Sequence, residues 1–561
     1  MKSKSRFRFD VKWAVILAII AFLLVFQVLP LLYLTIRAFF PEGRFSMEGL
    51  KRIYSYALNR SCLVNTLTVS AMSMVFGILI SFPLAWLVGR TNLYGRKFFR
   101  TLFVTTYMVP PYVGAMAWLR LLNPTVGTLN VFLKNLFHLS ALPFNIYTRG
   151  GLIWVLTTFY YPYAFITISR ALENMDPTME EASRISGASP LRTLFTVTIP
   201  LMLPSIIAAG LLVFVAAMSC YGIPSIIGAP GKIYTVTTRI AEYVSIGSAE
   251  GLTDATSLAF FLMVLALIIL YISERVLARK NYITISGKSM RPAIVDLGRF
   301  RIPITILVAL FAVVVILIPF GTVFATSLTM NMGKSVFAAG NLTTKYWKTI
   351  FSRSSIFKSA ANSLLYASLA ASFGMVICLI MAYLSERTNV KGKSIPNFLI
   401  TVGSGTPSVV IALALIMTMS GRFGINIYNT LFIMVIAYMI KYMLMGLRTV
   451  GSAYSQVSPS LEEAAQISGA GWIRRLTDVL FPLIIPSIVA GWFLIFMPSF
   501  YELTMSNLLY SSNTETLGVE LYLYQTYHSQ QTASAMAGAI LILVMVFNFL
   551  MGKLSKGKFS I

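Results

Sequence analysis

Residues 303–326 read PITILVALFAVVVILIPFGTVFAT, an apolar run that contains no charged side chain. About 20 apolar residues in a helix cross the hydrocarbon core of a membrane, so this run predicts a membrane-spanning helix. Such runs recur along the 561-residue chain, in which 57% of residues are hydrophobic and only 11% are charged. Soluble domains carry about 25% charged residues. The composition therefore excludes an ordinary soluble enzyme and predicts an all-α polytopic membrane protein.

Eleven further runs bring the expected number of membrane spans to twelve. They lie at 13–36, 61–89, 101–122, 150–172, 200–228, 256–277, 359–385, 396–419, 427–448, 482–508 and 533–552. With the amino terminus inside, 29 of the 45 Lys and Arg residues fall on the inner side. Positive charge is enriched in cytoplasmic loops, so we expect both termini to be cytoplasmic.

The remaining composition excludes several classes of function. The formal net charge is +26, but no basic stripe with interleaved aromatic residues lies outside the spans, so we expect no nucleic-acid partner. Three cysteines lie far apart, and the two histidines stand alone. This pattern fits neither a disulfide framework nor a zinc site. We therefore expect no metal site, and we find no arrangement of residues typical of a catalytic site.

The chain contains an internal repeat. Residues 176–188 read DPTMEEASRISGA and return at 458–470 as SPSLEEAAQISGA, at an offset of 282. Earlier in each copy, Arg-Thr-Asn-x-x-Gly at 90–95 returns at 387–392, at an offset of 297. The difference means that the first copy has about 15 extra residues, which we place in an external loop around 123–149, where insertions are tolerated.

Each copy holds six spans, so the two copies cross the membrane in the same direction. Parallel repeats of this kind are related by an axis along the membrane normal. We expect a first unit at 1–277, a basic cytoplasmic linker at 278–302 and a second unit at 303–561.

The repeated segments fall in the inner loops 173–199 and 449–481, between the fourth and fifth spans of each unit. Asp176 and Ser458 suit helix N-caps, each followed by a proline. Apolar residues then recur at a spacing of three residues, which predicts a short amphipathic helix. Such a helix can lie on the bilayer or dock on a partner, and its duplication favours docking on a partner of matching symmetry.

The repeated segment resembles the EAA loop of binding-protein-dependent ABC importer permeases. The matching residues are Glu180, Glu181, Ala182 and Gly187 in the first copy and Glu462, Glu463, Ala464 and Gly469 in the second. The resemblance implies two type I permease repeats in a prokaryotic cytoplasmic (inner) membrane. The fused layout and the Arg-Thr-Asn loops look most like the ferric-iron branch, with thiamine, polyamine and phosphonate permeases as alternatives.

In that family the EAA loop forms a coupling helix that contacts a cytoplasmic ATPase. The resemblance therefore implies two ATP-binding subunits, which use ATP and Mg, and an extracytoplasmic substrate-binding protein. Gly-Lys-Ser occurs three times in this chain, always without the earlier glycine that a P-loop requires. We expect a transport subunit that holds no cofactor and does not hydrolyse ATP itself.

Few charged side chains lie deep in a span, where they are costly and functional. By the resemblance, the fifth span of each unit lines the translocation path, and we expect Ser219, Tyr221, Tyr501 and Glu502 to face it. Alternatively, Glu502 sits at the outer mouth and hydrogen-bonds neighbouring helices. We expect Lys441 to extend to the inner surface. The alternative of another class is an ion-coupled secondary transporter, although the scarcity of buried ionisable groups disfavours proton coupling.

Overall fold

The computed structural model of the chain describes residues 11–41, 43–278, 294–332, 334, 338–471 and 474–554. Across these residues the structure is helical, with three isolated β-bridges and no strand. Ten helices are long and apolar enough to cross a membrane, and two bent helix pairs raise the number to as many as twelve. Most of the predicted linker, from 279 to 293, lies outside the described residues.

The helices of the first unit, in chain order, are α1 (Val11–Leu23), η1 (Leu24–Val28), α2 (Leu29–Phe39), α3 (Glu48–Ser55), α4 (Ala57–Arg90), α5 (Arg96–Thr105), η2 (Thr106–Met108), α6 (Pro111–Leu122), α7 (Thr128–Leu136), α8 (Arg149–Asn174), α9 (Thr178–Ile185), α10 (Pro190–Thr193), η3 (Leu194–Thr198), α11 (Ile199–Ser219), η4 (Pro224–Gly228), α12 (Val236–Ile246) and α13 (Ala249–Ala278).

Those of the second unit are η5 (Gly298–Phe300), α14 (Arg301–Ala312), η6 (Val313–Leu317), α15 (Ile318–Ser327), α16 (Lys345–Ser352), α17 (Ser354–Arg387), α18 (Ser394–Gly405), α19 (Ser408–Thr418), α20 (Leu431–Gln456), α21 (Pro459–Ile467), η7 (Arg475–Leu480), α23 (Phe481–Phe500), α24 (Ser506–Leu509), α25 (Leu517–Tyr527) and α26 (Gln530–Leu554).

The two units have the same core. In the first, α4 packs along α8 and both contact α11; in the second, α17 packs along α20 and both contact α23. A repeated asparagine fastens the same segment in each unit, since the Asn65 side chain donates to Tyr234 O (3.0 Å) and Asn362 donates to Glu515 O (2.9 Å). The sequence repeat therefore corresponds to a repeat of packing.

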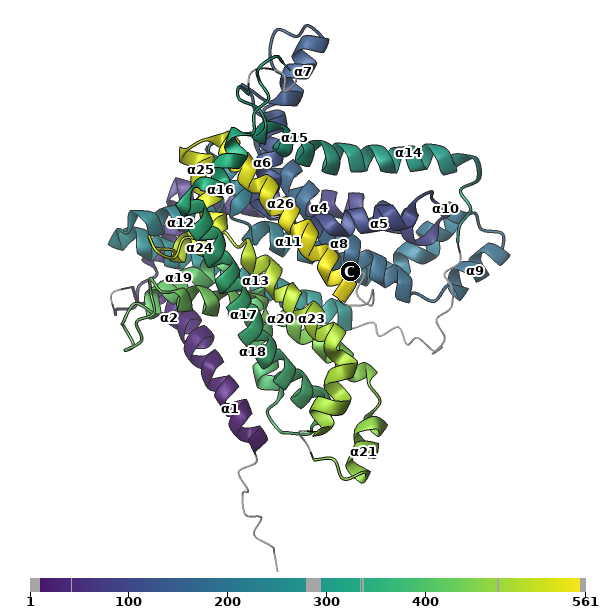
Figure 1. The fold of residues 1–561 in the computed structure, drawn as a ribbon, viewed down its shortest axis with the longest axis vertical. Helices are drawn as coiled ribbons and strands as arrows, with labels where there is room; N and C mark the ends of the chain where they lie inside the picture. Colours follow the sequence, from purple (N-terminus) through teal and green to yellow (C-terminus); the bar gives the residue numbers. More distant parts are fainter. Residues whose placement is uncertain are drawn as a thin grey trace, which may run out of the picture.

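The first helices of each unit cross to the other unit. Helices α1 and α2 pack on α18 and α19 of the second unit, whereas α14 and α15 pack on α5 and α6 of the first (Figure 1). This exchange interlocks the two halves.

The third span of each unit is not a straight helix, which corrects the expected spans 101–122 and 396–419. Each is a pair of helices, bent by 105° between 96–108 and 111–122 and by 108° between 394–405 and 408–418. The breaks fall at Pro110 and Pro407, and the residue before each proline has extended backbone, with ψ 138° at Val109 and 133° at Thr406. The proline ring disfavours helical backbone in the preceding residue. A proline at the matching position therefore bends the third span of each unit.

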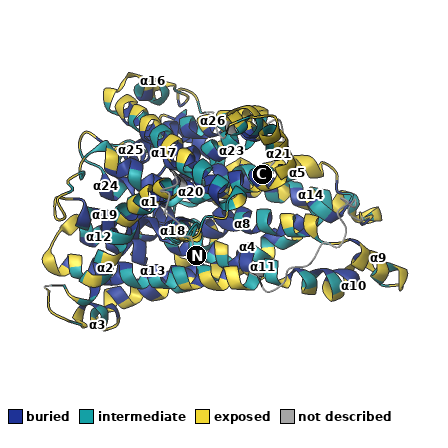
Figure 2. Cartoon of the chain, turned by 90° about the horizontal axis from the view of Figure 1, so that it is seen from below, coloured by how far each residue is buried: buried dark blue, intermediate teal, exposed yellow. Residues whose placement is uncertain are grey.

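Many large apolar side chains on the long helices are exposed. Figure 2 shows buried residues on the faces between helices and exposed residues on the outward faces. Leu79 on α4 and Leu307 on α14 are among the exposed side chains. Exposed apolar surface of this extent is rare on soluble monomers, and a surrounding bilayer accounts for it. The extra residues of the first unit hold α7, which projects from the bundle (Figure 1).

Candidate coupling helices and central cavity

The repeated Glu-Glu-Ala segments form two short helices, α9 and α21. Both project from the bundle on the side away from α12, α16 and α25 (Figure 1). Asp176 Oδ1 accepts a hydrogen bond from Thr178 N (2.9 Å), and Ser458 Oγ accepts one from Ser460 N (3.4 Å). The bonds from the Thr178 backbone N–H and hydroxyl lower the pKa of Asp176. Each helix therefore has a side chain at its amino end that satisfies a free backbone donor.

A glycine in the left-handed region ends each helix, with φ +83° at Gly187 and +82° at Gly469. Behind each glycine, Ala188 N donates to Ser183 O (3.1 Å) and Ala470 N donates to Ala465 O (2.9 Å). This pattern is the Schellman motif, which favours glycine because other residues are strained at positive φ.

The outer face of both helices presents the same apolar side chains to solvent. Ile185 is 88% exposed and Ile467, at the equivalent position, is 87% exposed. Ala182 and Ala464 are exposed as well, as is the second glutamate of each motif (Glu181 and Glu463). A large apolar side chain that is bare at the same place in two copies is typical of an interaction surface.

The first glutamate of each motif points the other way, into the protein. Glu180 Oε2 lies 3.6 Å from Arg90 Nε, and Glu462 Oε1 lies 3.3 Å from Arg387 Nε. Both arginines come from the repeated Arg-Thr-Asn-x-x-Gly motif. The two repeated motifs thus meet in space in each unit, a pairing that neither motif alone predicts.

A cavity of about 380 Å³ lies between the two units. It is lined by all four residues that were expected to face a pathway, Ser219, Tyr221, Tyr501 and Glu502. The expected fifth spans, 200–228 and 482–508, end early as helices at Ser219 and Phe500. Ser219 is the last residue of its helix, and the non-helical turns that follow the two helices bring Tyr221, Tyr501 and Glu502 to the cavity.

Tyrosine dominates the polar lining of the cavity. The seven tyrosines are Tyr107, Tyr112, Tyr160, Tyr163, Tyr221, Tyr442 and Tyr501. The Tyr112 hydroxyl and the Ser219 hydroxyl are buried and have no hydrogen-bond partner among the described residues. Buried hydroxyls are normally paired, so these two leave the cavity wall with unused hydrogen-bonding capacity.

Glu502 and Lys441 also line this cavity, and both come from the second unit. Glu502 Oε2 accepts from Met505 N (2.8 Å), Ser506 N (2.9 Å) and Ser506 Oγ (3.0 Å). Glu502 therefore bonds the start of α24 while lining the cavity, so features of both expected positions are present.

The expectation for Lys441 is wrong. Its Nζ does not extend to the inner surface but donates to Ser404 O (2.9 Å) and Thr406 O (2.8 Å). These carbonyls lose their helical partners where α18 ends before Pro407, and the ammonium group satisfies them. The residue at the equivalent position in the first unit is Phe159.

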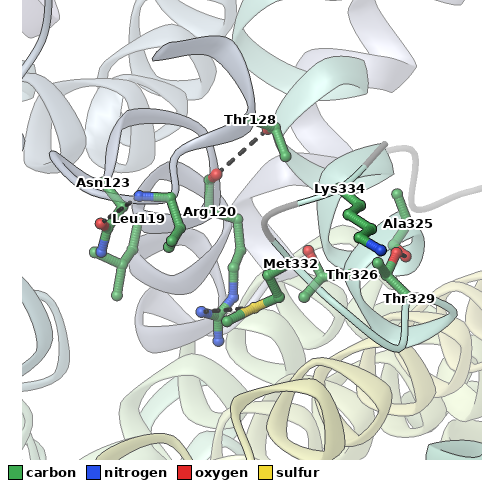
Figure 3. Close-up of a pocket in the computed structure, with 10 residues that line it drawn as sticks. Leu119, Arg120, Asn123, Thr128, Ala325, Thr326, Thr329, Met332 and Lys334 are labelled. Carbon is green, nitrogen blue, oxygen red and sulfur yellow. Dashed lines mark hydrogen bonds between the residues drawn. The ribbon is translucent and has the colours of Figure 1, made fainter. Parts of the chain in front are cut away.

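On the side opposite the coupling helices, Arg120 of α6 joins the two units. Its Nη2 donates to Gln525 Oε1 (2.7 Å) and to Gln530 O (3.2 Å), both in the second unit. Figure 3 shows Arg120 on one side of a small pocket and Lys334 on the other. The sequence reading missed Arg120, Arg90 and Arg387 as contact residues, although the repetition of the Arg-Thr-Asn motif marked the last two as important. Among the described residues no cluster of three or more His, Cys, Asp or Glu could hold a metal ion.

Comparison with known proteins gives consistent matches. Residues 81–281 and 374–559 each match the family described as binding-protein-dependent transport system inner membrane component. The ferric transport system permease protein FbpB of Actinobacillus pleuropneumoniae is 25% identical over 95% of this chain and 76% of its own length. The Fe(3+)-transport system permease protein FbpB 2 of Haemophilus influenzae is 24% identical over 92% of this chain and 93% of its own. A crystal structure of a bacterial ABC transporter that imports alginate aligns with 48% of this chain and 96% of its own, at 19% identity and a TM-score of 0.42.

Proposed function

Since the chain belongs to the family of binding-protein-dependent transport system inner membrane components, the permeases of ABC importers, we propose that it carries ferric iron across the cytoplasmic membrane. The chain is a transport subunit, not an enzyme. The choice of ferric iron is supported by the names of relatives that match nearly the whole chain. Both of its units match the permease family, so one chain supplies both halves of a translocation pathway.

The observation that carries the proposal is the pair of helices α9 and α21 with the same bare apolar face. Each receives one cytoplasmic ATP-binding subunit, with Ile185 or Ile467 as the apolar contact and Glu181 or Glu463 beside it. Two copies of one docking face suit two copies of one ATPase. Docking on these helices assigns them to the cytoplasmic side, and both chain termini then lie there too.

The cavity between the units is the substrate pathway in this proposal. Tyrosine, serine and glutamate side chains, which carry oxygen atoms, line it. Oxygen ligands suit a hard cation or its oxygen chelate. A pathway needs binding that is weak enough for release.

The test is uptake of radioactive ferric iron by vesicles that contain the full chain, its ATPase and its extracytoplasmic binding protein. Uptake that requires ATP hydrolysis and the binding protein supports the proposal. Uptake that follows an ion gradient without ATP identifies a secondary transporter instead. Uptake of labelled thiamine, polyamine or phosphonate by the same vesicles, with no uptake of iron, assigns the substrate to one of those classes and overturns the iron assignment.

A further inference from the structure

We propose that Arg90 and Arg387 are positioning residues that clamp each coupling helix to the end of a long membrane helix. We call each set of these contacts a latch. The second latch consists of Arg387, Glu462 and the carbonyl oxygens of Tyr454 and Val457. The first latch consists of the equivalent residues Arg90, Glu180, Leu172 and Met175. Only the transmission of force to an ATPase rests on the proposed function. The latch itself depends only on contacts within this chain.

The second latch joins three elements. Arg387 is the last residue of α17, and its Nη2 donates to the carbonyls of Tyr454 (2.6 Å), in α20, and Val457, just after it. On its other side, Nε faces Glu462 of α21 at 3.3 Å. One guanidinium thus holds the end of a membrane helix, the end of its neighbour and the coupling helix.

The first latch repeats this geometry residue for residue. Arg90 is the last residue of α4, and its Nη2 donates to Leu172 O (2.8 Å) and Met175 O (3.3 Å). Its Nε faces Glu180 of α9 at 3.6 Å. Leu172 and Met175 correspond to Tyr454 and Val457 at the repeat offset of 282. The same contacts are therefore present in both units.

The chemistry explains why arginine occupies this position. The carbonyls at the ends of α8 and α20 lack the regular helical donor four residues on, although Leu172 O and Tyr454 O each accept a longer bond (3.3 Å) from the N–H three residues on. They also lie at the negative end of the helix dipole, so they attract a cation. A carboxylate on the next helix needs a second, differently directed donor. The guanidinium offers five N–H groups in a rigid fork and can serve both, which a lysine ammonium on a flexible stem cannot do with the same geometry.

Burial increases the contribution of each arginine–glutamate ion pair to holding the coupling helix. The Nε atoms of both arginines and the facing oxygens, Glu180 Oε2 and Glu462 Oε1, are buried and have no hydrogen-bond partner among the described residues. Each of these atoms therefore depends on the ion pair. Removing one partner leaves the facing atom of the other buried without its ionic contact, which is unfavourable.

Hydrogen–deuterium exchange of the full-length protein tests the second latch without any ATPase. We expect Arg387→Met and the nearly isosteric Glu462→Gln each to speed amide exchange in peptide 459–467 by about tenfold or more, because bonds to a charged group are lost. The double variant should exchange no faster than Arg387→Met alone, since both changes break one unit. Arg448→Met is the matched control, because the Arg448–Glu274 ion pair near the same end of α20 is exposed and its loss should leave the peptide unchanged.

Unchanged exchange in both single variants, or fully additive changes in the double variant, would overturn the latch. The same variants, purified with the ATPase, then address function. Faster exchange with loss of substrate-stimulated ATP hydrolysis supports the latch as a force-transmitting contact. Faster exchange with unaltered ATPase stimulation keeps the latch and overturns instead the proposal that α21 transmits force to the ATPase.

Discussion

The two coupling loops present the same face to solvent but are fastened differently to the bundle. In the first, Thr198 Oγ1 donates to Glu180 Oε1 (2.7 Å), and the side chain of Glu180 is 4% exposed. In the second, the position of Thr198 is taken by Leu480, which cannot donate, and the side chain of Glu462 is 12% exposed. The docking face is shared between the copies while the support behind it has diverged.

Further contacts on the first side alone widen the difference. Arg100 pairs with Glu173 next to the first loop, whereas the equivalent residues of the second unit are Asn397 and Ser455. The linker also meets the first Arg-Thr-Asn motif, because Val295 N donates to Arg90 O (2.8 Å) and Leu297 N donates to Asn92 Oδ1 (3.0 Å). The first loop thus has contacts to the bundle and linker that the second lacks, whereas in the second loop Arg475 Nη1 donates to Gln466 Oε1 (2.9 Å). We expect the second loop to be the more mobile of the two.

The largest expected difference between the loops concerns loss of the latch arginines. Arg90→Met strands the more deeply buried carboxylate, and we expect it to destabilise the protein by about 3 kcal/mol or more. Arg387→Met leaves a carboxylate that water reaches more easily, and we expect a loss of about 1–2 kcal/mol. Thermal unfolding of the two purified variants measures the order, with Arg448→Met as the exposed control. Equal losses would contradict the difference in burial between the two latches.

The shared docking face predicts equal effects on the two sides. An aspartate in place of Ile185 or Ile467 puts a charge at the centre of the proposed contact, and the loss of a central contact residue weakens binding by about 2 kcal/mol or more. Each change should therefore reduce ATPase association about thirtyfold. Because both side chains are exposed, the thermal stability of the permease alone should change little, by about 0.5 kcal/mol at most.

Titration of the ATPase against each purified variant in detergent gives the binding constants. An effect confined to one of the two variants would mean that only one coupling helix receives an ATPase subunit.

Some features of the fold could be predicted from the sequence and others could not, for physical reasons. Hydrophobic run length, charge bias and a repeat at fixed offset predicted the helical membrane fold and the positions of α9 and α21, because these depend on local composition. Pro110 and Pro407 were visible, yet the bends they cause were not expected, because proline is also tolerated within straight membrane helices.

Contacts between distant parts of the bundle could not be predicted from the sequence. The pairing of Arg90 with Glu180 joins residues 90 positions apart in the chain, and neither motif by itself predicts contact with the other. The place of Lys441 depended on free carbonyls at a bend that had not been predicted. From composition alone, a lysine in a membrane span is expected to extend to the nearest aqueous surface. In the structure, Lys441 instead donates to carbonyl oxygens inside the bundle.

A third difference is expected from the extra hydrogen bond of the first loop. Thr198→Val keeps the shape of the side chain but removes the donor to Glu180, and bonds to charged groups contribute about 1.5 kcal/mol or more. Thermal unfolding should show that loss in the variant. Val in place of Leu480, the equivalent position, removes no hydrogen bond and should lower stability only by the smaller amount for a lost methylene group, about 1 kcal/mol. No loss of stability in Thr198→Val would show that packing, and not the hydrogen bond, holds the first loop.

The smallest effect should be the same in both loops. Gly187 and Gly469 have nearly equal positive φ, and an added Cβ would meet no atom within 4 Å at either position, so only backbone strain opposes an alanine. Left-handed backbone costs a residue with a side chain about 1 kcal/mol, and Gly187→Ala and Gly469→Ala should each loosen the helix end by that amount. Gly451→Ala is the control, because Gly451 lies within α20 with open space around it and no positive φ, and there alanine should be neutral or stabilising. Amide exchange at the ends of α9 and α21 measures both changes. If one loop responded and the other did not, the difference between the loops would extend from the latch to the turn itself, and the freedom assigned to the second loop would have to be sought in its glycine.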